Sequence, residues 1–93
     1  MNIKDYLTEA EILAQLAEEA AELAQAALKL RRVLDGTNPT PVTAIDAKAQ
    51  LREEFADVLN CIEPILTAGD ALMLPTIQDA KRERWLKRLE ERQ

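Results

Sequence analysis

Apolar residues recur along the chain with the spacing of amphipathic helices. Between positions 12 and 34 they form one narrow stripe, made by Ile12, Leu16, Leu23, Ala27, Leu30 and Leu34. A second stripe follows, made by Leu51, Phe55, Val58, Ile62, Ile65 and Leu66. This spacing indicates two helices, each with one buried face. The side of the first helix that lies opposite its stripe is expected to face solvent, and it holds Glu18, Gln25, Lys29 and Arg32.

Capping residues mark the ends of the first predicted helix. Thr8 and Glu11 have the spacing of a capping box, which places a helix start at this point. The next helix stop is Gly36, because glycine is the usual residue just beyond a helix C-terminus. Residues 36–43 contain two prolines among polar residues and are predicted to form a loop.

Two prolines divide the rest of the chain. A second helix is expected from Thr43 to about residues 68–70, with a kink or an early end near Glu63 because Pro64 lies within it. An apolar segment at 71–74 then leads to Pro75-Thr76, where a last helix is expected to open and to run to about Glu91.

The composition predicts a single all-α domain, residues 1–93, with a thin core. Hydrophobic residues make up 47% of the chain but aromatic residues only 3%, so large buried side chains are scarce. A domain of this length buries a small share of its surface. We therefore expect a small helical bundle of two long helices, a short helical segment and a C-terminal helix. A homodimer or homotetramer is expected to complete it.

Charge and the lack of long apolar runs exclude several classes of protein. The net charge is −5, which argues against a nucleic-acid binder. Residues 81–93 carry +3, so residues 1–80 carry −8. No run approaches the roughly 18 apolar residues of a membrane helix, and the first residues do not resemble a signal peptide. We expect a cytoplasmic protein that binds neither nucleic acid nor membranes.

Acidic residues interrupt the edges of both apolar stripes. Glu19 and Glu22 form a pair three residues apart on the first helix, and Glu54 and Asp57 form a second pair on the next. If the helices pack antiparallel through these faces, four carboxylates converge. Converging carboxylates repel one another, and their partial burial is unfavourable without a positive partner.

A divalent cation with oxygen ligands fits this cluster. The chain contains no histidine, which excludes the Glu-x-x-His pairs of di-iron bundles and argues against zinc. The pattern therefore favours Mg²⁺, with Mn²⁺ as the alternative.

Residues 18–22 read Glu-Glu-Ala-Ala-Glu, and residues 54–57 read Glu-Phe-Ala-Asp. This resembles the E-E-x-x-E … E-x-x-D signature of the all-α nucleoside triphosphate pyrophosphohydrolases, which include MazG and the dCTP and dimeric dUTP pyrophosphatases. The resemblance covers residues 8–68. It implies dimers or tetramers that hydrolyse NTP or dNTP to the monophosphate and pyrophosphate in nucleotide-pool housecleaning. It also implies an accessory acid, Glu18, and four metal ligands, namely Glu19, Glu22, Glu54 and Asp57.

The chemistry of such a site assigns further roles. A triphosphate brings about four negative charges, which a bound metal ion offsets while it activates water. A carboxylate that the metal does not fully engage, Glu18 or Glu22, can take the proton of that water. Lys81 and Arg84 are candidates to hold the phosphates, either in the same chain or from a neighbouring subunit. Asn60 is a candidate substrate contact or a solvated residue.

Trp85 is expected in the core or at an interface, with stacking on a base as the alternative. A non-catalytic helical dimerisation or protein-interaction module is the competing functional interpretation. Acidic pairs on helices are common as solvated faces, so each pair alone carries little information. An interaction module, however, has no reason to place acids beside its apolar seam.

Overall fold

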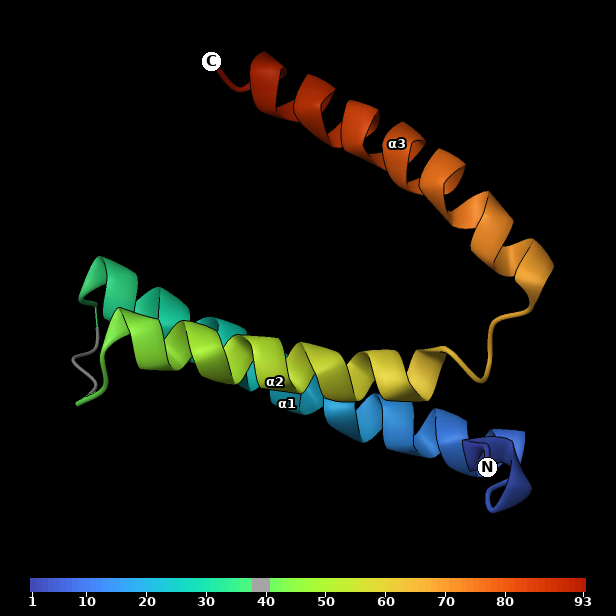
Figure 1. The fold of residues 1–93 in the computed structure, drawn as a ribbon. Coiled ribbons are helices and arrows are strands. Elements are labelled where there is room, and N and C mark those ends of the chain that lie inside the picture. Colours follow the sequence, from blue (N-terminus) through green and yellow to red (C-terminus); the bar gives the residue numbers. More distant parts are fainter. Residues whose placement is uncertain (38–40) are drawn as a thin grey trace.

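The protein is all-helical in the computed structural model, which describes residues 1–37 and 41–93. A short 3-10 helix, η1 (Ile3–Asp5), precedes three long helices: α1 (Glu9–Asp35), α2 (Ala44–Ile62) and α3 (Ala68–Glu91). No strand occurs in these residues, so the predicted all-α class is confirmed (Figure 1).

Helix α1 begins and ends at the predicted capping residues. The Thr8 hydroxyl accepts a hydrogen bond from the Glu11 backbone N–H at 3.1 Å, and the Glu11 carboxylate accepts one from the Thr8 N–H at 2.9 Å. These bonds satisfy donors that a helix start otherwise leaves free. Gly36 follows the last turn with a φ of 68°, a left-handed conformation that suits glycine.

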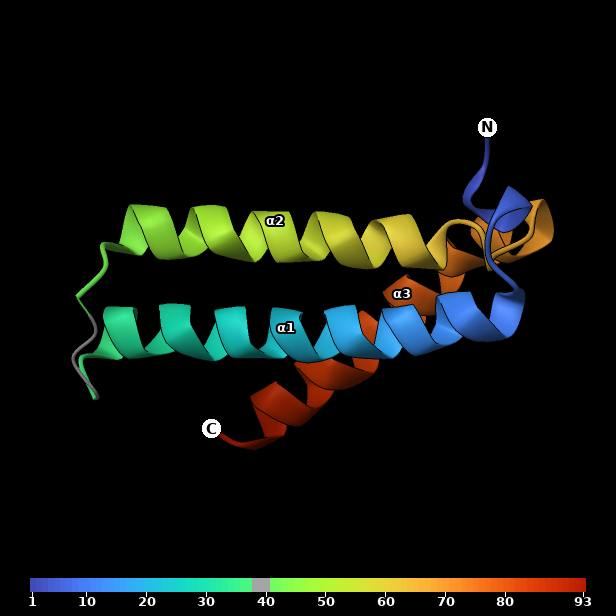
Figure 2. The ribbon, with the colours of Figure 1, turned by 90° about the horizontal axis from the view of Figure 1, so that it is seen from below.

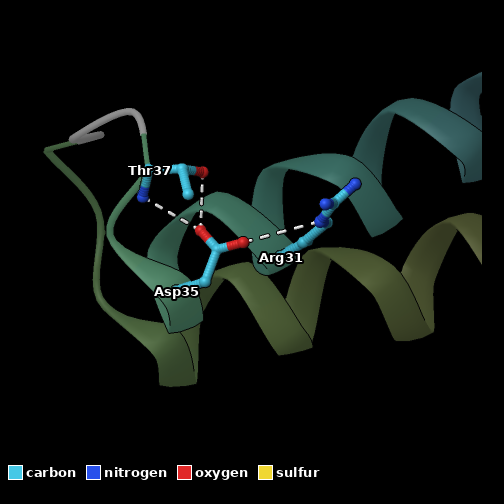
Figure 3. Close-up of polar contacts among 3 residues, drawn as sticks. All are labelled: Arg31, Asp35 and Thr37. Carbon is cyan, nitrogen blue, oxygen red and sulfur yellow. Dashed lines mark hydrogen bonds and ion pairs between the residues drawn. The ribbon is translucent and has the colours of Figure 1, made fainter.

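Asp35 lies in the last turn of α1 (Figure 3). Its Oδ1 accepts hydrogen bonds from the hydroxyl and the backbone N–H of Thr37, at 2.7 Å and 3.0 Å, and Arg31 Nε lies 3.5 Å from Oδ2. These hydrogen bonds, and then the charge of Arg31, lower the pKa of Asp35. They also offset the unfavourable position of an acid at a helix C-terminus.

Helix α2 ends early, as the sequence predicts. The Thr43 hydroxyl caps its start by accepting from the Asp46 N–H at 3.1 Å, and the helix ends at Ile62, two residues before Pro64. Glu63 keeps helical dihedral angles, with φ −54° and ψ −47°, but Pro64 has no backbone N–H to donate to the helix, so the regular hydrogen-bond pattern ends here. Positions 38–40 of the predicted 36–43 loop lie outside the described residues.

The predicted start of the last helix is wrong. Helix α3 begins at Ala68, and Pro75 lies inside it rather than at its first turn. The reason is a capping box about two turns further back. The Thr67 hydroxyl accepts from the Asp70 N–H at 3.1 Å, and the Asp70 carboxylate accepts from the Thr67 N–H at 3.0 Å. The apolar segment 71–74 therefore belongs to the helix.

Helices α1 and α2 form an antiparallel hairpin, in which they lie side by side along their lengths (Figures 1 and 2). The buried residues of the hairpin are Ile12 and Ala26 of α1 and Ala47 and Cys61 of α2. Because three of these four side chains are small, the two helices approach closely but bury little apolar surface. The core is as thin as the composition predicts.

Helix α3 runs away from the hairpin and buries none of its side chains (Figure 1). Large apolar residues remain uncovered along it, including Leu72 and Trp85, which are 82% and 60% exposed. A single chain therefore forms a two-helix hairpin with a separate third helix, which is consistent with the predicted small all-α bundle, whereas its completion by a homo-oligomer stays a prediction. None of the helices in the described part of the chain has the length and apolarity needed to cross a membrane.

Candidate functional site

The two acidic pairs meet at the middle of the hairpin. Helix α1 contributes Glu19 and Glu22, and α2 contributes Glu54 and Asp57; one carboxylate oxygen from each lies within 4.8 Å of the others. Glu19 and Glu54 are half-buried between the helices, whereas Glu22 and Asp57 lie at the exposed edge. The predicted convergence of four carboxylates is confirmed. Their role as metal ligands stays a prediction.

Two carboxylate oxygens of this acidic cluster have no hydrogen-bond donor among the described residues. Glu19 Oε2 and Glu54 Oε2 are buried and accept no hydrogen bond, whereas Glu19 Oε1 accepts one from Gln15 Nε2 at 2.7 Å. A buried carboxylate oxygen without a partner is unfavourable, and a cation is the partner that would satisfy two such oxygens at once. An all-oxygen set of four carboxylates suits a hard cation such as Mg²⁺, so the residues present fit the metal that the sequence favours.

The acidic cluster raises the pKa of Glu22 and contributes to the raised pKa of the Cys61 thiol. Repulsion from Glu19, and then from Glu54, raises the pKa of Glu22 above its usual range. Burial raises the pKa of the Cys61 thiol, and the charges of Glu19 and Asp57 raise it further. Cys61 is thus a protonated, buried side chain of the hairpin core, where it packs as a small hydrophobe.

The raised pKa of Glu22 predicts how the metal-free fold responds to pH. The folded chain holds this proton more tightly than the unfolded chain does, so stability falls as pH rises from the ordinary value of 4.5 through the raised folded pKa. Thermal unfolding in the presence of a chelator should show the midpoint falling across this window. Glu22→Gln should flatten that fall; an unchanged slope in this variant would contradict the assignment to Glu22.

The other predicted site residues lie outside this group. Glu18 is exposed on α1, and the structure does not bring it to the four carboxylates. Asn60 lies about one turn beyond Asp57 on α2. It lines a small pocket of about 190 Å³ together with Ile3, Leu7, Ile12, Gln15 and Cys61. The role of Asn60 as a substrate contact stays a prediction.

Lys81, Arg84 and Trp85 lie on α3, where they border a hollow together with Arg88. This hollow is lined by α3 alone, so the structure does not place these three residues beside the carboxylates of the same chain. Their predicted contact with substrate therefore depends on a second copy, as the sequence argument for a neighbouring subunit supposes.

Two basic residues that sequence reasoning placed in solvent line a cleft beside the acidic cluster. The cleft has a volume of about 640 Å³ and is lined by Glu22, Gln25, Ala26, Lys29, Arg32, Gln50 and Glu54. Lys29 and Arg32 are half-buried in it. A sequence signal was present: Glu22, Gln25, Lys29 and Arg32 follow one another at spacings of three or four, so they form one row along the helix.

Comparison with family models, with curated proteins and with solved structures finds no match to this chain.

Proposed function

We propose that the protein is a Mg²⁺-dependent nucleoside triphosphate pyrophosphohydrolase, which converts an NTP or dNTP to the monophosphate and pyrophosphate. The observation that carries the proposal is the convergence of four carboxylates, two of which hold a buried oxygen without a donor. The spacing of these residues in the E-E-x-x-E … E-x-x-D pattern supports the same reaction. Glu19, Glu22, Glu54 and Asp57 would hold the metal, with Mn²⁺ as a possible substitute.

The residues of the cluster have different parts in this reaction. Bound Mg²⁺ offsets the charge of the triphosphate and favours attack by water. Glu19 and Glu54 are fixed between the helices and keep the cluster in place. Glu22 combines exposure with a position on the wall of the cleft, so it is the carboxylate best placed to accept the proton of the attacking water. Glu18 lies outside the four converging carboxylates, so it is less suited to accept this proton.

The direct test is a panel of ribonucleoside and deoxyribonucleoside triphosphates, assayed for monophosphate and pyrophosphate with Mg²⁺ and with a chelator. The proposal requires Mg²⁺-dependent release of pyrophosphate from at least one nucleotide, and the best substrate would identify the preferred base. Release of inorganic phosphate and a diphosphate would indicate another hydrolase reaction. Absence of any turnover would favour the competing function.

We also propose that the chain works as a homo-oligomer. Helix α3 exposes apolar side chains, and most of the basic segment 81–93 lies on it. The rest of the chain is acidic. On α2, Phe55 and Leu59 are 51% and 38% exposed. These surfaces are complementary in polarity and in charge, so α3 of one copy can cover the hairpin of another. Such an arrangement would also bring Lys81 and Arg84 to a neighbouring acidic cluster.

A non-catalytic helical dimerisation or interaction module is the second candidate function, because the uncovered apolar face of α3 is also what such a module needs. The acidic cluster distinguishes the interaction module from the pyrophosphohydrolase. A module gains nothing from buried carboxylate oxygens without donors, so neutralising Glu19 or Glu54 would leave its function unchanged.

A further inference from the structure

The cleft beside the acidic cluster has opposite charges at its two ends. Glu22 and Glu54, which belong to the cluster, form one end, and Lys29 and Arg32 lie further along α1. A metal site is expected at the first end, and the second end presents two cations. The cleft is about 640 Å³ in volume, which gives room for an extended ligand.

The two cations are held in the cleft without an acidic partner. Lys29 Nζ donates a hydrogen bond to Gln50 Oε1 of α2 at 3.2 Å, a neutral contact that fixes the ammonium group between the helices. Neither Lys29 nor Arg32 forms an ion pair with the described residues. The neighbouring Arg31, in contrast, is exposed and paired with Asp35. Within the described part of the chain, Lys29 and Arg32 therefore have no paired carboxylate, and the carboxylates that share their cleft are Glu22 and Glu54 of the cluster.

The spacing of Lys29 and Arg32 along α1 determines what kind of anion can contact both of them and the acidic cluster. Lys29 and Arg32 follow Glu22 by seven and ten residues, which corresponds to about 10 Å and 15 Å along the helix axis. A compact anion cannot contact both cations and a metal ion at the cluster. A linear polyphosphate can, because its negative charges are spread along its length, and lysine and arginine are the usual side chains that bind phosphate.

We propose that Lys29 and Arg32 bind the β- and γ-phosphates of the substrate, which leave together as pyrophosphate. The identity of the ligand as a nucleotide rests on the proposed function. If the bond between the α- and β-phosphates lies at the cluster, the distal phosphates extend along the cleft toward the two cations. The nucleoside then points the opposite way along the hairpin, toward the small pocket lined by Asn60 and Ile12. Both cations would also stabilise the charge that develops on the leaving pyrophosphate.

The test is calorimetric titration of inorganic triphosphate into the full chain in the presence of Mg²⁺. Lys29→Met and Arg32→Gln should each weaken binding by about tenfold or more, as expected for loss of a charge-assisted hydrogen bond. Lys29→Arg keeps the charge and should retain most of the affinity. Exposed matched controls, Lys48→Met and Arg31→Gln, should bind as the wild type does, because neither residue lines the cleft.

The outcomes separate this inference from the proposed function. Wild-type affinity in both Lys29→Met and Arg32→Gln, or no binding of triphosphate by the wild type, would overturn the inference even if the protein hydrolyses nucleotides. Selective loss in these two variants would support it, and it would do so even if no nucleotide is hydrolysed. Titration of Mg²⁺ alone should give the same affinity in both variants as in the wild type, which shows that the acidic cluster is intact.

Discussion

Replacing Glu54 by Gln should lower Mg²⁺-dependent nucleotide turnover by a factor on the order of a thousand. Glu54 is half-buried between α1 and α2, and its Oε2 accepts no hydrogen bond from the described residues, so a bound cation would satisfy it. The amide of Gln has nearly the same shape but lacks the negative charge. The change therefore removes a metal ligand without creating a cavity, and steady-state kinetics at saturating nucleotide measures its effect.

Glu53→Gln is the matched control, because it makes the same change one position earlier on α2, where the side chain is exposed and outside the cluster. It should leave turnover within about twofold of the wild type, as expected of a surface substitution. Circular dichroism should show both variants folded. In metal-free conditions Glu54→Gln should be at least as stable as the wild type, since it removes one of four mutually repelling charges. Equal turnover in both variants would refute the role of Glu54.

Truncating Trp85 to Ala should dissociate the proposed homo-oligomer. Trp85 is 60% exposed in the single chain and lines an apolar hollow on α3 with Leu74 and Ile77. In the proposed assembly, a second copy would cover this hollow and bury Trp85. A buried tryptophan is typical of the residues that dominate the energy of an interface. We expect the dissociation constant to rise by at least about 30-fold, measured by sedimentation equilibrium over a range of protein concentrations.

Lys87→Ala is the control for this substitution. Lys87 lies two residues further along α3 and lines neither of the hollows around Trp85, so its truncation should leave the dissociation constant nearly unchanged. A wild-type chain that sediments as a monomer at all concentrations would contradict the proposed assembly. An oligomer that survives Trp85→Ala would show that copies meet through another surface.

Local signals in the sequence were sufficient to predict α1, the end of α2 and the two separate acidic pairs. Thr8, Gly36 and Pro64 act on their own or neighbouring backbone, so their effect can be read without knowledge of the fold. The convergence of Glu19 with Glu54 needed one further assumption, antiparallel packing through the apolar stripes. A hairpin joined by a short loop satisfies it.

The start of α3 was missed because two competing signals lie close together. Pro75 is acceptable in the first turn of a helix, and the sequence argument placed it there. The stronger signal is the reciprocal capping by Thr67 and Asp70, which begins the helix about two turns earlier. Whether α3 packs on the hairpin depends on tertiary contacts that helical periodicity does not contain.

Lys29 and Arg32 were missed for a different reason. Periodicity treats each helix as a cylinder with one buried side, and on that cylinder both residues fall opposite the apolar stripe. In the hairpin, Gln50 of α2 reaches Lys29 from the side, and the long basic side chains border the cleft between the helices. The register of one helix against the other creates this cleft, and a single-helix pattern does not encode it.

Titration of Mg²⁺ into the metal-free chain, followed by calorimetry, is the most direct measurement of whether the four carboxylates form a metal site. The wild type and the exposed-acid control Glu53→Gln should bind Mg²⁺ with the same affinity, whereas Glu19→Gln and Glu54→Gln should each lose binding by at least about tenfold. No heat of binding in the wild type, or equal binding in all four proteins, would contradict a metal centre at Glu19, Glu22, Glu54 and Asp57.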